Sequence, residues 1–182
     1  MKPLSLLRKF TLAGLFLTML IAVALAWGIQ QHLEQAALRQ EAESAAAQVA
    51  TLLHPNLRLI DFSGPLDPAR YAQIDTLIRQ NILSSHIVRV KIWNREGMLL
   101  YADEPDLAGR RFAIDPDLQA ALDGQIVMDV SSLSKEENVG ERGRFDRLLE
   151  IYVPVRPLDS SQIAGAYEIY HDLAAMEPHI AD

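Results

Sequence analysis

The chain has 182 residues, of which 49% are apolar, and it contains no cysteine. These values fit one compact domain with additional segments. They exclude a wholly disordered chain, disulfides, thiol catalysis and cysteine-ligated metals. The formal net charge is −7, and all 24 acidic residues lie after residue 33. Such an acidic region repels a phosphate backbone, so no nucleic-acid partner is expected.

The first predicted element is a membrane-spanning helix over residues 10–29, which read FTLAGLFLTMLIAVALAWGI and carry no charge. About 20 helical residues cross a hydrocarbon core of about 30 Å. Because Lys2, Arg8 and Lys9 precede this run, residues 1–9 are expected in the cytoplasm. The remainder is then expected in the periplasm or extracellular space of a bacterium, anchored in its inner membrane.

Two alternatives for the apolar run remain open. One is a buried core helix, which an uninterrupted run flanked by cations disfavours. The other is a cleaved signal peptide covering residues 1–26, because Ala24-Leu25-Ala26 matches the small-x-small cleavage pattern. In both membrane-related interpretations, the domain that follows is exported.

Residues 30–54 are predicted to continue the same helix beyond the membrane. Residues 30–53 contain no glycine or proline and are rich in alanine, glutamine and glutamate. His54-Pro55 ends the helix, because a residue before proline disfavours the helical conformation. The small residues of this helix are expected to pack on the domain or on a second copy of the chain, as in a homodimer. A solvated stalk is the alternative.

Residues 55–171 are predicted to form a single α+β domain. After a loop over 55–66, Asp67-Pro68 supplies an N-cap and a first-turn proline for an amphipathic helix over 68–84. Asp115-Pro116 repeats this device for a short helix that Gly124 closes. The remaining predicted elements are strands at 87–93, 98–102 and 125–131, a polar loop at 134–146, and a closing hairpin within 148–171 that turns at 157–161.

This order of elements predicts a five-stranded antiparallel sheet with flanking helices. Its connections are local, and the turn Asn94-Arg95-Glu96-Gly97 between the first two strands has the residues of a type I turn. After the last strand, Asp172 is expected to cap a helix over residues 172–182 that leads back towards the membrane.

Neither an enzyme nor a metal site is expected in this chain. Nucleophile-elbow, phosphate-loop and zinc-protease motifs are absent from the sequence, and its five histidines lack metal-ligand spacing. Acidic residues crowd the segment 103–123, where a solvated acidic face is favoured over a divalent-cation site. No cofactor is expected.

The candidate binding residues are cations and tyrosines on the predicted strands. In the strand 87–93, alternation places two cations on one face, where they could form the wall of a site for a small anionic ligand. Tyrosines on neighbouring strands could close it, since tyrosine offers an apolar wall with one polar group. A solvent-facing sheet surface and plain core packing are the alternatives. The candidates are Arg89, Lys91, Tyr101, Tyr152 and Tyr167.

The stretches VRVKIWNREGMLLYADEPDLAGRRF, DPDLQAALDGQIV, LLEIYVPVR and IAGAYEIYHDL resemble the PDC/Cache sensor domains of bacterial membrane receptors. The resemblance covers residues 30–177 and implies a PAS-like fold. The motifs that carry it are the NREG hairpin, Leu107-Ala108-Gly109-Arg110 with Phe112, the helix end at Ala121 to Gly124, Glu150-Tyr152-Pro154, and Gly165 with Glu168 and Tyr170.

The resemblance implies an extracytoplasmic sensory input region for a histidine kinase, a diguanylate cyclase or a phosphodiesterase, or less often for a chemotaxis receptor. Such a region binds a small ligand and relays its state through membrane helices. Because the family pattern continues into a second membrane helix, the chain is expected to be a truncated part of a longer receptor. An anchored periplasmic module that binds another protein, without a small ligand, is the alternative function.

Overall fold

The structure is a computed structural model that describes residues 6–131 and 148–173. It divides into two units, residues 1–41 and 42–182. The first unit consists of the N-terminal part of helix α1 (Leu6–Leu53), along which the large apolar side chains between Leu15 and Ile29 are more than half exposed. Within the described part of the chain, no helix reaches the combination of length and apolarity required of a membrane span.

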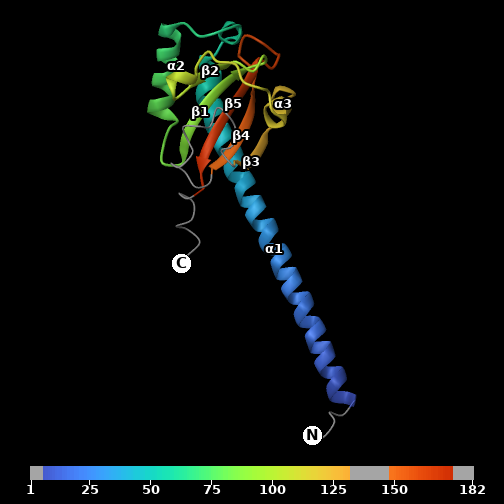
Figure 1. Ribbon diagram of the computed structural model, residues 1–182. Helices are drawn as coiled ribbons and strands as arrows, with labels where there is room; N and C mark the ends of the chain where they lie inside the picture. Colours follow the sequence, from blue (N-terminus) through green and yellow to red (C-terminus); the bar gives the residue numbers. More distant parts are fainter. Residues whose placement is uncertain (1–5, 132–147, 174–182) are drawn as a thin grey trace. The chain divides into compact units, whose positions relative to one another are not determined.

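The second unit is built on one five-stranded sheet (Figure 1). Its order is β2-β1-β5-β4-β3, and every pair of neighbouring strands is antiparallel. This confirms the predicted sheet, and with its flanking helices the unit is an α+β, PAS-like domain. The strands are β1 (Ile87–Asn94), β2 (Leu99–Ala102), β3 (Val127–Ser131), β4 (Leu148–Val155) and β5 (Gly165–Asp172).

Two helical layers explain why the three central strands are buried on both faces. Helix α2 (Pro68–Asn81) contacts one face, where Asp75 accepts a hydrogen bond from Tyr101. The end of α1 contributes a buried stripe at helical spacing, which consists of Ala42, Ala45, Ala46, Val49 and Leu53. We call the side of the sheet that carries Tyr101 the α2 face.

Helix α3 (Pro116–Leu122) contacts the opposite side, which we call the α3 face. There Leu118 and Leu122 pack in one apolar cluster with Trp93 and Tyr152. The N-caps predicted for both helices are confirmed. Asp67 accepts hydrogen bonds from the first turn of α2, and Asp115 accepts one from Leu118 N.

Hydrogen bonds from the backbone to the Asn94 side chain stabilise the turn between β1 and β2, as predicted. Asn94 Oδ1 accepts hydrogen bonds from Glu96 N and Met98 N. Gly97 has φ +70°, and a Cβ there would lie 2.7 Å from the carbonyl oxygen of Phe112. Glycine is therefore required at Gly97 both by its backbone conformation and by space.

Several predicted boundaries are wrong. Helix α2 ends at Asn81 rather than at residue 84, and the loop over 55–66 contains two short 3-10 helices, η1 (His54–Asn56) and η2 (Leu59–Phe62). A third, η3 (Pro105–Leu107), follows β2. Asp172 is the last residue of β5 and is paired with Leu148. The helix expected beyond Asp172 lies largely outside the described residues, as do the loop 134–146 and residues 1–5 of the N-terminal segment.

Candidate functional site

The candidate site is a buried group of charged and aromatic side chains on the α3 face. The strand register builds it, because residues directly opposite one another on antiparallel strands share a face. Lys91 of β1 lies opposite Glu168 of β5, and Glu168 lies opposite Tyr152 of β4. Two positions further along, and so on the same face, Glu150 lies opposite Tyr170. We call Lys91, Glu150, Glu168 and Tyr170 the buried polar cluster.

Lys91 contacts two other members of the cluster, Tyr170 and Glu168. Its Nζ lies 3.0 Å from Tyr170 Oη and 3.5 Å from Glu168 Oε1. The same atom lies 4.7 Å from the centre of the Tyr170 ring, within the range of a cation–π contact. Because Lys91 is only 1% exposed, these contacts replace the water that its ammonium would otherwise bind.

The two glutamates of the cluster are joined through Tyr170. Its hydroxyl donates to Glu150 Oε1 at 2.7 Å and also contacts Glu168 Oε1. Trp93 Nε1 donates to the other carboxylate oxygen of Glu168 at 2.5 Å. Burial, and then the nearby charges of Glu168 and Glu150, raise the pKa of Tyr170 well above its usual value, so this phenol keeps its proton at neutral pH.

Arg89 lies on the same face as the buried polar cluster and contacts the loop that follows β2. Its guanidinium donates to Asp103 Oδ2 at 2.6 Å and to Glu104 Oε1 at 2.5 Å. Burial raises the pKa of Asp103, although Arg89 acts in the opposite direction. Arg89 and Lys91 therefore both contact carboxylates of the domain itself, and an anionic ligand would have to replace those carboxylates.

The sheet separates the five residues that the sequence suggested for one site. Arg89, Lys91 and Tyr152 lie on the α3 face. Tyr101 lies on the α2 face, where its hydroxyl donates to Asp75 Oδ1 at 2.9 Å. Tyr167 also lies on the α2 face, and its ring centre is 5.6 Å from that of His54. The ligand-binding role of these residues stays a prediction, and the five cannot line one side of the sheet.

Sequence reasoning missed Glu150 and Glu168 as members of the site. A signal for them was present, because Glu150 interrupts an otherwise apolar strand and Glu168 lies between the apolar and aromatic residues of another. A charged residue inside a strand that is buried on both faces needs a partner in the next strand. Finding that partner requires the register, which sequence alternation does not supply.

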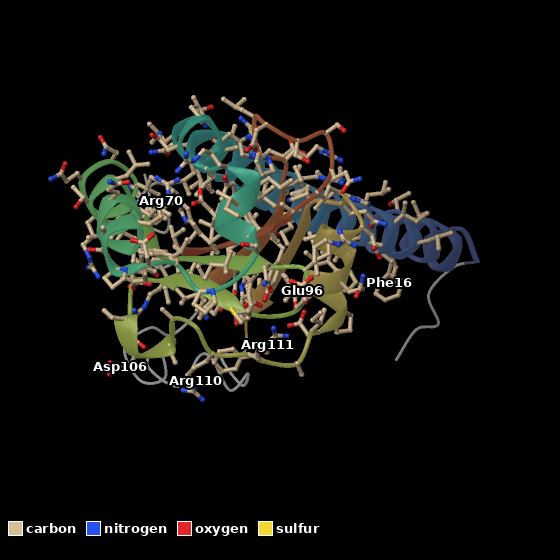
Figure 2. All side chains as sticks on the ribbon, turned by 90° about the horizontal axis from the view of Figure 1, so that it is seen from above. Phe16, Arg70, Glu96, Asp106, Arg110 and Arg111 are labelled. Carbon is tan, nitrogen blue, oxygen red and sulfur yellow. The ribbon has the colours of Figure 1, made fainter. Side chains whose placement is uncertain are left out.

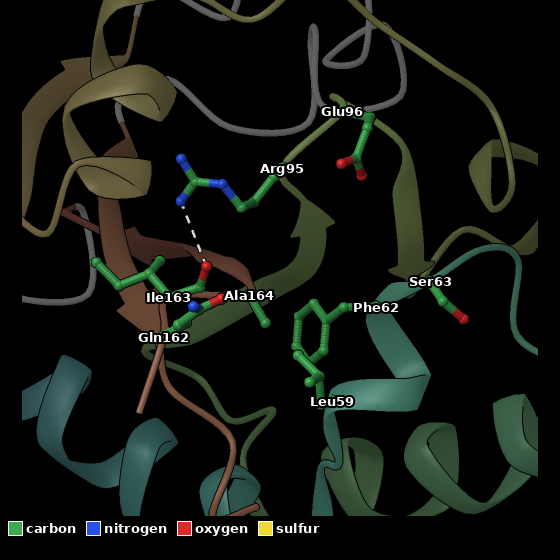
Figure 3. A pocket seen from close by; sticks show the side chains of 8 residues that line it. All are labelled: Leu59, Phe62, Ser63, Arg95, Glu96, Gln162, Ile163 and Ala164. Atoms are coloured by element: carbon green, nitrogen blue, oxygen red, sulfur yellow. Dashed lines mark hydrogen bonds between the residues drawn. The ribbon is translucent and has the colours of Figure 1, made fainter. Parts of the chain in front are cut away.

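A separate open cavity of about 220 Å³ lies at the end of the sheet where the β1–β2 turn is located (Figure 3). Its apolar wall includes Phe62, and its polar wall includes Arg95 and Glu96. Arg95 donates to the carbonyl oxygens of Leu122 at 2.9 Å and Ile163 at 3.3 Å, so it joins α3 to the loop before β5. None of the five predicted binding residues lines this cavity.

The Leu107-Ala108-Gly109-Arg110 motif lies at the edge of the domain. Asp106 and Arg110 are exposed, and Figure 2 shows both side chains on its outside. The guanidinium carbon of Arg110 lies 5.0 Å from the centre of the Phe112 ring, and Phe112 in turn packs edge-on against Trp93. The motif thus closes the apolar end of the α3 face and does not itself enter the buried polar cluster.

This geometry defines a fold class: a PAS-like α+β domain with a buried group of polar side chains on the sheet face opposite α2. Comparison with solved structures agrees on the fold. The E. coli DcuS sensor domain superposes with a TM-score of 0.54 and 18% identity, over 80% of this chain and 98% of that one. The sensor domain of the V. cholerae histidine kinase DctB superposes with a TM-score of 0.52 and 16% identity.

An extracellular ligand-binding receptor from Desulfohalobium retbaense is also similar, with a TM-score of 0.50 and 14% identity. The matched region spans 57% of the DctB structure and only 23% of this receptor. No family model and no curated protein sequence matches the chain. At these identities the likeness establishes the fold, and the resemblance to PDC/Cache sensor domains is confirmed at that level.

Proposed function

We propose that this chain is the extracytoplasmic sensory input region of a membrane-bound receptor. The observation that carries the proposal is the buried polar cluster on the α3 face of a sensor-domain fold. Burying ionic groups costs free energy even when they are paired, and a fold that needed only stability would fill this face with apolar side chains. We propose that a small ligand binds on this face and changes the pairing of the cluster.

The fold also offers a route for the signal. Ligand binding shifts a two-state equilibrium only through different contacts in the two states. Strand β5, which carries Glu168 and Tyr170, also carries Tyr167, whose ring contacts His54, the residue directly after α1, on the α2 face. A change in the pairing of β4 and β5 therefore reaches the helix that we propose leads to the membrane. The output would be a histidine kinase, a diguanylate cyclase or a phosphodiesterase outside this chain, and we propose no catalysis within it.

The experiment compares two tyrosines on opposite faces. Thermal unfolding of the full chain in detergent is measured with small carboxylates, amines and amino acids, each added alone. A compound that binds raises the midpoint temperature. In Tyr152→Phe this rise is expected to shrink, because the substitution removes a polar group from the α3 face. In Tyr167→Phe it is expected to persist, because that hydroxyl lies on the α2 face.

The same two variants separate the proposal from its alternative. Tyr167 Oη has no hydrogen-bond partner among the described residues, so Tyr167→Phe is itself expected to be neutral or to stabilise the domain by about 1 kcal/mol. An effect of Tyr167→Phe on ligand response, with none from Tyr152→Phe, would contradict the α3-face site. If no compound raises the midpoint, the protein-interaction module becomes the better proposal.

One observation favours that alternative enough to retain it. Ile60 is 66% exposed and Leu158 is 76% exposed. They lie in segments that are joined, because Leu59 N donates to Asp159 Oδ1 at 2.8 Å. Large exposed apolar side chains on neighbouring segments are typical of protein contact surfaces.

A further inference from the structure

Helix α2 is joined to the end of the edge strand β2 by three hydrogen bonds. Two of them end on carbonyl oxygens of the backbone at the point where the chain leaves β2. The position of α2 on the sheet therefore depends on how firmly residues 101–103 are held. The three bonds, written donor first, are Tyr71 Oη to the Ala102 carbonyl oxygen, Tyr101 Oη to Asp75 Oδ1 at 2.9 Å, and Arg79 Nη2 to the Asp103 carbonyl oxygen at 2.7 Å.

The same segment is held from the opposite face of the sheet by Arg89. This arginine lies on the α3 face of β1, and its guanidinium donates to Asp103 Oδ2 at 2.6 Å. The side chains of Arg89 and Asp103 are only 5% and 10% exposed, so water and salt compete little with this charged hydrogen bond. Asp103 can be reached from both faces because β2 is the last strand of the sheet.

Asp103 thus has partners on both sides, with its carboxylate bound by Arg89 and its carbonyl oxygen bound by Arg79 of α2. Residues that share a partner are coupled energetically, even where they do not touch each other. We propose that Asp103 couples the two faces of the sheet. When Arg89 releases the carboxylate, the segment after β2 loosens and α2 loses part of its attachment to the sheet.

The apolar contacts of α2 determine what this loss does. Ile74 and Ile78 are 2% and 0% exposed, so the helix stays packed against the domain by side chains that do not involve Asp103. Weaker polar attachment is therefore expected to make α2 open more often, as a local event, while the sheet remains folded.

This coupling is a property of the folded chain and needs no small ligand, and so it goes beyond the function proposed above. One consequence rests on that proposed function. A ligand that binds on the α3 face and takes Arg89 from Asp103 would loosen α2, because it contacts Arg89 differently in the two states. Helix α2 would then be a second element, besides the end of α1, that responds to the ligand.

The test uses a single thiol as a reporter on α2, since the chain has no cysteine of its own. In Ile78→Cys the thiol replaces a fully buried side chain, so a water-soluble thiol reagent reaches it only when α2 opens. The full chain in detergent is labelled with and without Asp103→Ala. Asp103→Ala is expected to speed labelling by a factor of about 3 or more, because Arg89 no longer fixes the segment after β2.

Glu104→Ala is the matched control. It also removes a carboxylate bound to Arg89, at 2.5 Å, but no hydrogen bond among the described residues joins Glu104 to α2. It is expected to leave the labelling of Ile78→Cys unchanged. Asp103→Asn keeps an oxygen that can accept from Arg89, so it is expected to give a smaller acceleration, and it serves as the test variant if Asp103→Ala does not fold.

A second reporter separates local opening from a general loss of stability. Ala46→Cys places the thiol in the buried stripe of α1, where Asp103→Ala is expected to leave labelling unchanged. Three results would overturn the coupling: no acceleration at Ile78→Cys, an equal acceleration from Glu104→Ala, or an equal acceleration at both reporters. Because no ligand is added, these results are independent of whether the α3 face binds one.

Discussion

At the scale of single residues, Gly165 marks a close approach between the backbones of β5 and β1. Gly165 begins β5 at the point where η2 covers the end of the sheet. A Cβ at this position would lie 1.9 Å from the carbonyl oxygen of Trp93 and 2.8 Å from the ring of Phe62. The β5 backbone therefore approaches β1 in a way that only glycine permits.

Gly165→Ala is expected to destabilise the domain by about 3 kcal/mol, because β5 must move away from β1 to relieve the overlap. The measurement is denaturant unfolding of the full chain, followed by circular dichroism. Gly64→Ala is the matched control, since nothing lies within 4 Å of a Cβ added there. Equal stability of the two variants would contradict the close approach.

At the scale of elements, a bidentate ion pair orders the segment between α1 and α2. Arg70 of α2, labelled in Figure 2, donates to both carboxylate oxygens of Asp61 in η2, at 2.9 and 2.7 Å, and also to the carbonyl oxygen of Asn56. Burial by itself would raise the pKa of Asp61. Hydrogen bonds from Arg70 and from the Arg58 backbone outweigh burial, and the pKa of Asp61 is lowered.

Arg70→Met is expected to lower the free energy of unfolding by about 2 kcal/mol at neutral pH, since Asp61 keeps its burial and loses its charged donor. Because the folded pKa of Asp61 is below its unfolded value, its stabilisation is present above about pH 4 and is lost as the pH falls further. The wild type should therefore lose more stability on acidification than Arg70→Met does.

The comparison is made by thermal unfolding at several pH values. Arg79→Met on the same helix is the control, because the pair of Arg79 with Asp75 is more exposed than that of Arg70 with Asp61 and is expected to contribute less than about 1 kcal/mol. If both variants lost stability equally, with the same dependence on pH, the ion pair of Arg70 with Asp61 would not order this segment.

At the scale of the whole molecule, the sequence of residues 10–29 leads us to propose a membrane anchor. The apolar side chains exposed along this part of α1, from Leu15 to Ile29, support the proposal. Apolar side chains exposed to water along a whole helix are unfavourable, and insertion into the hydrocarbon core of a bilayer would remove them from water.

The full chain, expressed in a bacterium, is expected to remain in the membrane fraction after alkaline carbonate extraction. Leu20→Lys combined with Ile21→Lys should release it, because two ammonium groups at the centre of the run each cost about 3 kcal/mol in a bilayer. Protease added to spheroplasts should cleave the wild-type domain if it lies outside the inner membrane. Recovery of the wild type in the soluble fraction would contradict the anchor.

The homodimer expected from the small residues of α1 has its own test, which is disulfide cross-linking of Ala36→Cys in the same membranes.

The sequence by itself determined the local features of this protein. The N-caps Asp67 and Asp115 and the turn from Asn94 to Gly97 each depend on neighbours within a few residues, and these were predicted correctly. The PAS-like sheet followed from the order of these elements and from the resemblance that their motifs carry.

Only the tertiary structure decided which side chains share a face. Tyr152 and Tyr167 are alike in the sequence, yet register places one beside Glu168 on the α3 face and the other against His54 on the α2 face. A shift of one residue in strand pairing exchanges the two faces, and that pairing is set by contacts between residues distant in the chain. For the same reason Lys91, predicted as the wall of an anion site, proves to be buried against a glutamate and a tyrosine of β5, a strand that begins more than 70 residues later.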